Sequence, residues 1–222
     1  MRRSAVRIRK WAPKDIMNIE MLFPTPVAVQ RYEKSSCKEY AQLLIDMCNS
    51  VDRKPYNGCF VSDDDLNERP EFLSLFDIIN GNVMIYAEEV LGVSKQDIKI
   101  DCMWANVHDS GHKHQSHVHP NSFISGVFYL QVPEESEMVG DLYFNDPRTL
   151  KSMMYADFKK QSPVSDRNWI YKPETGMMVL FPGWLEHGTN IFVCNSGEKR
   201  VAVSFNYSVL KCSSKTMRFN HG

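Results

Sequence analysis

The 222-residue chain lacks any apolar run of the roughly 18–20 residues that a membrane-spanning helix needs. Its first residues contain no apolar segment of signal-peptide length. A formal net charge of −1 gives no general attraction to nucleic acid or to an anionic membrane. These absences predict a soluble globular protein of the cytoplasm without clear nucleic-acid binding. They do not indicate an oligomeric state.

Cysteine pairs at short spacing are also missing. The six cysteines are spread along the chain without a CxxC motif, whereas small disulfide-stabilised domains are much denser in cysteine. We therefore expect reduced and mostly buried thiols. The residues are Cys37, Cys48, Cys59, Cys102, Cys194 and Cys212.

The N-terminal segment lacks acidic side chains, because residues 1–14 contain only basic charges. A solvated tail or an upstream start explains this most simply, and a nucleic-acid arm or a targeting extension is the alternative. We expect a basic extension over 1–20, then an entry strand and supporting helices over 21–97 in the same domain. A β core over 98–210 and a tail over 211–222 complete the expected organisation.

Two helices are predicted before residue 98. Apolar residues recur with helical spacing over 35–50 and again over 70–91, where Pro70 can begin a helix and Gly92 can end it. Two prolines within 21–30 exclude a helix there and favour an extended edge strand. The segment 51–69 is polar and contains the turn signal Asn57-Gly58.

From residue 98 the apolar pattern changes to a period of two, which is typical of strands. Turn residues separate the alternating segments, which are 98–107, 123–132, 141–144, 169–171, 177–181 and 200–209. Two helices followed by many short strands predict a mainly β protein, a sandwich or barrel with helices packed outside it.

Four of the seven histidines lie within residues 112–119. In an extended strand His117 and His119 would point to the same face, so both could bind one metal ion. A third ligand must come from elsewhere, and His187 is the other histidine within strand-like sequence. The simpler interpretation of a histidine-rich loop is a solvated one, and we predict that for His108, His112 and His114.

Arg200 lies inside an apolar strand. Such an arginine either faces solvent or points into a pocket, where its planar guanidinium can bind a carboxylate with two hydrogen bonds. Tyr129 has similar alternatives, since it could be an ordinary core residue.

These elements together resemble the 2-oxoglutarate- and Fe(II)-dependent oxygenases, especially a bacterial and phage subgroup with prolyl-hydroxylase-like features. The resemblance covers roughly residues 21–208. Its motifs are the 22–27 entry, His117-Val-His119, Ser125–Leu130, Gly140–Arg148, Pro173–His187 and Arg200–Asn206.

The resemblance implies a double-stranded β-helix, which is a jelly-roll, cupin-like barrel, with Fe(II) inside one end. It implies His117, His119 and His187 as metal ligands. It places Arg200 and Tyr129 at the distal carboxylate of 2-oxoglutarate and Asn106 in the same cosubstrate pocket. The implied reaction hydroxylates a protein, peptide or small molecule with O₂ and releases succinate and CO₂.

The chain departs from the superfamily pattern at one ligand. Most members have an aspartate or glutamate where this chain has His119, and three neutral ligands leave the iron one unit more positive. In the alternative, His119 is not a ligand, and water or a carboxylate such as Asp141 or Asp146 takes that place. A serine common in relatives is Ala202 here.

Two other function classes remain open at this point. A cupin-like module could bind a metal or ligand without turnover, and such binding would survive Arg200→Ala. A zinc hydrolase could use three histidines and would act without O₂.

Overall fold

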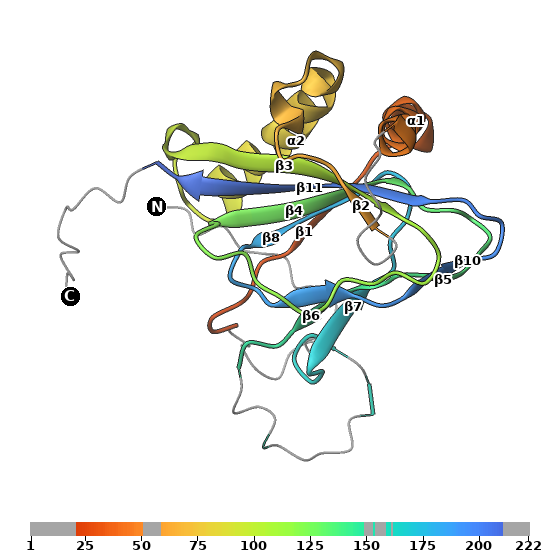
Figure 1. Cartoon of the computed structure of the whole chain (residues 1–222). Coiled ribbons are helices and arrows are strands. Elements are labelled where there is room, and N and C mark those ends of the chain that lie inside the picture. The colour runs from red at the N-terminus through yellow and green to blue at the C-terminus, as the bar shows by residue number, and fades with distance from the viewer. Residues whose placement is uncertain (1–20, 51–58, 149–152, 154–158, 161, 211–222) are drawn as a thin grey trace, which may run out of the picture.

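The computed structural model describes residues 21–50, 59–148, 153, 159–160 and 162–210. The expected N-terminal extension and C-terminal tail lie outside these residues. A six-stranded antiparallel sheet, the main sheet, crosses the centre in the order β1-β8-β4-β11-β3-β2 (Figure 1). In that order its strands are Ala28–Arg31, Met177–Pro182, Ile124–Gln131, Arg200–Val209, Ile98–His108 and Cys59–Val61.

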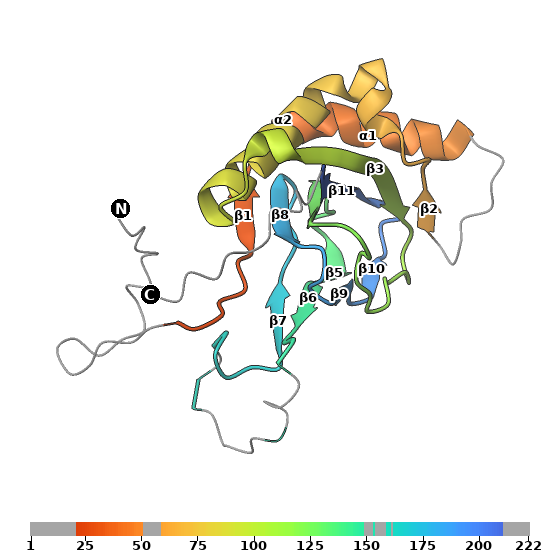
Figure 2. The same cartoon turned by 90° about the vertical axis from the view of Figure 1, so that its left-hand side faces the viewer.

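Two small sheets lie below the main sheet, on the side away from the helices (Figure 2). One has the order β7-β6-β9 and the other pairs β10 with β5. The strands are β5 Ser136–Val139, β6 Leu142–Asn145, β7 Asn168–Tyr171, β9 His187–Thr189 and β10 Phe192–Cys194. The mainly β architecture with flanking helices is therefore confirmed.

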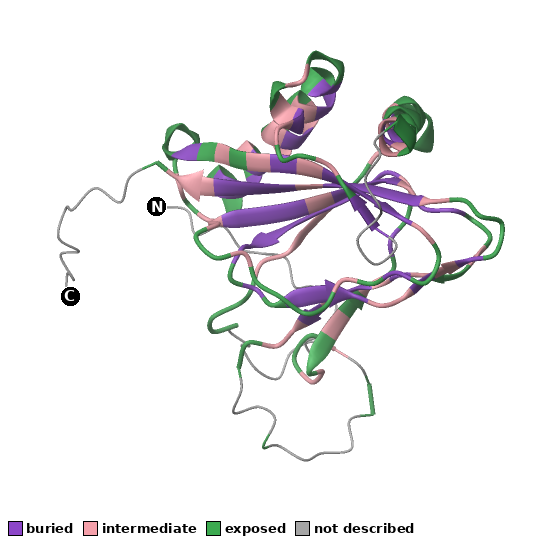
Figure 3. Cartoon of the chain, in the orientation of Figure 1, coloured by how far each residue is buried: buried purple, intermediate pink, exposed green. Residues whose placement is uncertain are grey.

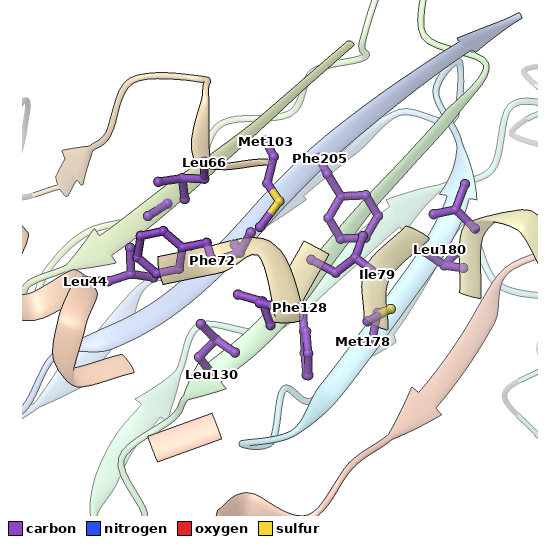
Figure 4. Close-up of a cluster of buried hydrophobic side chains, with 14 of the residues drawn as sticks. Leu44, Leu66, Phe72, Ile79, Met103, Phe128, Leu130, Met178, Leu180 and Phe205 are labelled. Carbon is purple, nitrogen blue, oxygen red and sulfur yellow. The ribbon is translucent and has the colours of Figure 1, made fainter. Parts of the chain in front are cut away.

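The helices cover the opposite face of the main sheet. They are α1 Lys34–Ser50 and α2 Leu73–Ile85, with short 3₁₀ turns at Leu66–Glu68, Pro70–Phe72 and Lys95–Asp97 and a π turn at Tyr86–Val90. Leu44 of α1 and Ile79 of α2 pack against Phe128 and Phe205 of the sheet in the helix-side core (Figure 4). Buried residues dominate the central strands of the main sheet, whereas exposed residues lie on the helices and in the loops (Figure 3). Among the described residues, no helix is long and apolar enough to cross a membrane.

Strand alternation separates the helix-side core from the site. In β11, Val201, Val203 and Phe205 belong to the helix-side core, whereas Ala202 belongs to a second core between the main and small sheets. Successive side chains of a strand point to opposite faces, so Arg200 shares the inner face with Ala202. The outer residues thus fix the strand while the inner residues remain available for chemistry.

The predicted helix over 70–91 is present as one continuous helical segment whose pitch changes. A 3₁₀ turn at Pro70–Phe72 precedes α2 Leu73–Ile85, and the π turn at Tyr86–Val90 follows it. The polar segment 51–69 contains β2, which pairs with β3 and forms one edge of the main sheet. The entry strand begins at Ala28 and forms the other edge, where its preceding prolines cost no ladder hydrogen bonds.

Gly126→Ala is expected to destabilise the protein by about 1–3 kcal/mol. A Cβ on Gly126 would overlap the Phe205 ring and the Leu180 side chain in the helix-side core. Urea unfolding measures the change. Gly81→Ala is the matched control, because nothing lies within 4 Å of its added Cβ. That helical substitution should raise stability by about 0.5–1 kcal/mol, and an unchanged midpoint for Gly126→Ala would contradict the packing.

Candidate metal and cosubstrate site

Three histidines from distant parts of the chain meet on the inner side of the fold. His117 and His187 form an antiparallel bridge, with N···O distances of 2.8 and 3.0 Å. The His119 amide donates to the Gly183 carbonyl at 3.0 Å. One ligand atom from each histidine lies within 4.8 Å of the other two. The spacing of His117 and His119 together with this backbone bridge brings the triad together.

The ring orientations of two of these histidines follow from backbone contacts. His117 Nδ1 lies 2.8 Å from the Gln115 carbonyl oxygen, and His187 Nδ1 lies 2.8 Å from the Leu185 carbonyl oxygen. A carbonyl can only accept, so each Nδ1 carries the proton. The Nε2 lone pair of each ring is then left for a metal ion, in the manner common to metal-ligating histidines.

His119 is oriented differently, through a side-chain pair. Its Nδ1 lies 3.3 Å from Asn206 Nδ2, and Ser125 donates to Asn206 Oδ1 at 2.7 Å. The amide nitrogen can only donate, so in this arrangement His119 Nδ1 accepts and Nε2 of the neutral ring carries the proton. Turning the amide over would place the proton on Nδ1 and leave Nε2 free. Asn206 and Ser125 therefore control which nitrogen of His119 is available. Neither Asp141 nor Asp146 belongs to a candidate ligand cluster among the described residues.

Burial keeps two of the three histidines, His119 and His187, neutral. It lowers the pKa of His119 to about 4, with the charge of His117 adding to the effect. It also lowers the pKa of His187 to about 4, against a smaller raising effect of the hydrogen bond to Leu185. Neutral imidazole is the form that binds metals, so His119 and His187 could still bind an ion in mildly acidic solution.

A cavity lies beside the triad. Its lining includes all three histidines. Farther along the inner faces of β3, β4 and β11, it also includes all three residues predicted to bind the cosubstrate. The predicted lining residues are Asn106, Tyr129 and Arg200, and Ala202 lies between Arg200 and the triad side of β11.

Arg200 is buried and only partly satisfied. Its Nη1 donates to the carbonyls of Gly140 at 2.7 Å and Val139 at 3.2 Å, and its Nη2 lies 2.7 Å from His108 Nδ1. Its Nε makes no hydrogen bond. Burial lowers the pKa of Arg200, and Tyr129 partly offsets this. The pocket-facing alternative for this arginine is correct and the solvent-facing one is wrong.

Tyr129 and Asn106 complete the inner wall. Tyr129 is 2% exposed and its ring centroid lies 5.9 Å from Arg200 Cζ. Burial raises the pKa of Tyr129 to about 12, so its hydroxyl remains protonated. Asn106 Nδ2 donates to Ser204 Oγ at 3.0 Å.

The prediction of solvated His108, His112 and His114 is wrong. His108 is 1% and His112 is 7% exposed, and His114 is half-buried. With Cys59 they form a second group whose ligand atoms lie within 4.8 Å of one another, named here the Cys/His cluster. Burial lowers the pKa of His114 to about 3 and that of His108 well below its usual value.

Sequence reasoning overlooked this cluster because its contacts are not local. Cys59 lies opposite His108 across β2 and β3, and Arg200 lies opposite His108 across β11 and β3. Asn206 belongs to the Arg200–Asn206 motif, but the sequence alone does not predict its contact with His119. The even spacing of Asn206 and Arg200 along β11 was the available signal.

The fold and the three-histidine cluster define a class, a double-layered β protein with three imidazole side chains lining its inner cavity. Residues 102–206 match the family model described as "Putative 2OG-Fe(II) oxygenase". The β core is therefore similar to that of the 2-oxoglutarate- and Fe(II)-dependent oxygenases, an enzyme family that uses Fe(II), 2-oxoglutarate and O₂. This confirms the enzyme class and cosubstrates expected from the sequence. No curated protein matches the chain.

Solved structures support the same fold. A prolyl-4-hydroxylase from Pseudomonas putida has a TM-score of 0.58 at 10% identity, covering 83% of this chain and 93% of that one. HygX from Streptomyces hygroscopicus, with nickel, 2-oxoglutarate and hygromycin B bound, has a TM-score of 0.56 at 12% identity and 83% coverage of each chain. The epimerase SnoN from nogalamycin biosynthesis has a TM-score of 0.58 at 10% identity, covering 83% and 79%. The predicted double-stranded β-helix is thus confirmed, while these relatives differ in their reactions.

Proposed function

We propose that the chain is a 2-oxoglutarate-dependent hydroxylase in which His117, His119 and His187 hold Fe(II). The observation that carries this proposal is the orientation of His117 and His187, whose Nδ1 atoms are bound to backbone carbonyls. Their Nε2 atoms are left for one ion, close to a ligand atom of His119. Imidazole suits iron, so the donor set fits the group that the family uses.

Three neutral ligands give this centre a particular electrostatic character. An ion held by three imidazoles keeps its full double charge, whereas a carboxylate ligand would reduce it by one unit. The site should therefore attract the anionic cosubstrate more strongly than the common two-histidine, one-carboxylate set does. Burial of His187 and half-burial of His119 strengthen this attraction, because solvent screens it less.

Arg200 is proposed to hold the distal carboxylate of 2-oxoglutarate. The buried Nε without a hydrogen bond is a donor that the protein itself does not satisfy, and leaving such a group unpaired costs about 1–3 kcal/mol. A carboxylate in the cavity would satisfy it by a charge-assisted bond. Tyr129 and Asn106 line the same cavity and would orient the remaining oxygens.

When bound, Fe(II) and 2-oxoglutarate would activate O₂, with release of succinate and CO₂ and oxygen transfer to a C–H bond. The three histidines would orient the open face of the site toward the cavity. Arg200 would fix the cosubstrate, and Phe181 and Leu142 would exclude water from its apolar side.

A peptidyl substrate, prolyl in type, is the finer part of this proposal. A groove adjoins Phe144, whose ring lies 5.9 Å from that of His187. Its lining combines aromatic side chains such as Trp169 and Tyr171 with polar and basic ones such as Arg148 and Arg167. An extended peptide can use such a surface, because aromatic rings pack on proline and polar groups bind the backbone.

Anaerobic addition of Fe(II) and 2-oxoglutarate to the full chain is expected to give a weak visible charge-transfer band. Arg200→Gln should lose the band at cosubstrate concentrations that saturate the parent. The control Arg31→Gln should retain it, since Arg31 is exposed and pairs with Glu174. Circular dichroism verifies that both variants fold.

Turnover is then measured with a peptide pool in air, as succinate formation and a product heavier by one oxygen atom. Absence of both the band and succinate would overturn the proposal. Activity with Zn²⁺ in the absence of O₂ would indicate a hydrolase instead. Hydroxylation of a small molecule but of no peptide would reject the substrate class alone.

A further inference from the structure

We propose that Cys59, His108, His112 and His114 form a second metal site, distinct from the triad, of the kind that takes Zn²⁺. One ligand atom from each residue lies within 4.8 Å of the others. In a tetrahedral zinc site with bonds of about 2.0–2.3 Å, neighbouring ligand atoms are roughly 3.3–3.6 Å apart. Small side-chain movements are therefore sufficient to close the cluster around an ion.

The backbone around the Cys/His cluster is already fixed. Cys59 and His108 are directly paired across β2 and β3. The His112 carbonyl accepts from the Phe192 amide at 2.8 Å, and the His114 amide donates to Thr189 Oγ1 at 2.9 Å. Little conformational freedom remains to be lost when an ion binds, which favours affinity.

The ligand types select the ion. One thiolate and three imidazoles form a closed four-ligand set, which is typical of structural zinc rather than of an open catalytic centre. Burial raises the pKa of Cys59 to about 12, so metal binding would displace the thiol proton. Two of the three imidazoles are buried, and nothing charged needs to be removed from them before an ion binds.

Arg200 connects the Cys/His cluster to the cavity, because it contacts His108 of the cluster and lines the cavity. A guanidinium only donates, so the lone pair of neutral His108 faces Arg200 Nη2, and His108 Nε2–H faces His114 Nε2 at 3.0 Å. An ion bound by His108 competes for that lone pair and releases Nη2. Together with the unpartnered Nε, it would present the two-donor edge that binds a carboxylate. This consequence, but not the metal site itself, rests on the proposed function.

Cobalt is the probe that distinguishes the two sites. The full chain is stripped with a chelator, kept reduced and titrated with Co²⁺ without O₂. We expect two equivalents to bind, with a thiolate-to-cobalt charge-transfer band in the near ultraviolet. Cys59→Ser should lose the band and one equivalent. The control Cys48→Ser should keep both, because Cys48 is a half-buried thiol outside the candidate metal clusters.

The experiment tests the proposed function at the triad and the proposed Cys/His site separately. His187→Gln should still bind one equivalent of Co²⁺ and keep the thiolate band, whatever reaction the triad supports. If Cys59→Ser does not fold, His112→Gln provides the test. We expect it to bind the Co²⁺ ion that gives the thiolate band at least about 10-fold more weakly. Wild-type protein without a thiolate band, or a band that survives Cys59→Ser, would overturn the proposal.

Discussion

His187→Gln is expected to weaken Fe(II) binding at the triad by at least about 100-fold, more than the 10–100-fold typical of losing an outer-shell partner. His187 lies in β9, is 6% exposed, and presents Nε2 because Leu185 holds its Nδ1 proton. Glutamine keeps a polar side chain of similar length but offers a weaker neutral oxygen. The Fe(II)–2-oxoglutarate charge-transfer band measures the loss, because it requires cosubstrate on the iron and is not produced by the Cys/His cluster.

Gln115→Ala is the matched control for this prediction. Gln115 contacts His117 through its backbone carbonyl, and its side chain is exposed. Removing that side chain should leave the band unchanged. An unaltered band in His187→Gln would show that the ligand set is wrong and would require another residue in its place.

Lowering the pH from 7.5 to 5 is expected to reduce the unfolding free energy of the metal-free protein by several kcal/mol. Burial lowers the pKa of His114 to about 3 and the pKa of both His119 and His187 to about 4. The unfolded chain has histidines with a pKa near 6.5 and therefore binds protons that the folded chain does not. Stability is complete above about pH 6.5 and is lost as the pH falls toward 4.

The magnitude follows from the width of that interval. At pH 5 each strongly buried histidine lowers the unfolding free energy by roughly 2 kcal/mol, because pH 5 lies about 1.5 units below the unfolded-state pKa and each unit is worth 1.36 kcal/mol. Partial exposure of His114 and His119 reduces their share. Urea unfolding at several pH values measures the dependence, and His187→Gln should reduce its slope by up to one proton. An unfolding free energy that stays constant or rises as the pH falls from 6.5 to 5 would contradict this prediction.

Long alternating strands were predictable to within a residue or two. β3 and β11 were expected at 98–107 and 200–209 and are observed at Ile98–His108 and Arg200–Val209. Both have an apolar face against the helices, and this face sets the period. The short strands were not predictable, because β9 and β10 have three residues each and show no periodicity.

The site was predictable where ligands are adjacent in sequence or part of an ordered motif. His117 and His119 follow from their spacing, and His187 follows from the resemblance. The environment of His108 could not be inferred, because it depends on Cys59 and Arg200 reaching it from two neighbouring strands. The polar residues next to His108 in sequence predict a solvated side chain, whereas the residues opposite it on the neighbouring strands bury it.

The alternation of β11 couples folding to catalysis through a single segment of backbone. Val203 and Phe205 are fully buried against the helix layer. From the same strand, Arg200 lines the cavity and Asn206 contacts His119. A change of packing among the helices that shifts this strand would move Arg200 and the partner of His119 together. Substitutions far from the metal, in α1 or α2, could thus alter cosubstrate affinity, whereas the loops around the groove can change substrate preference without that cost.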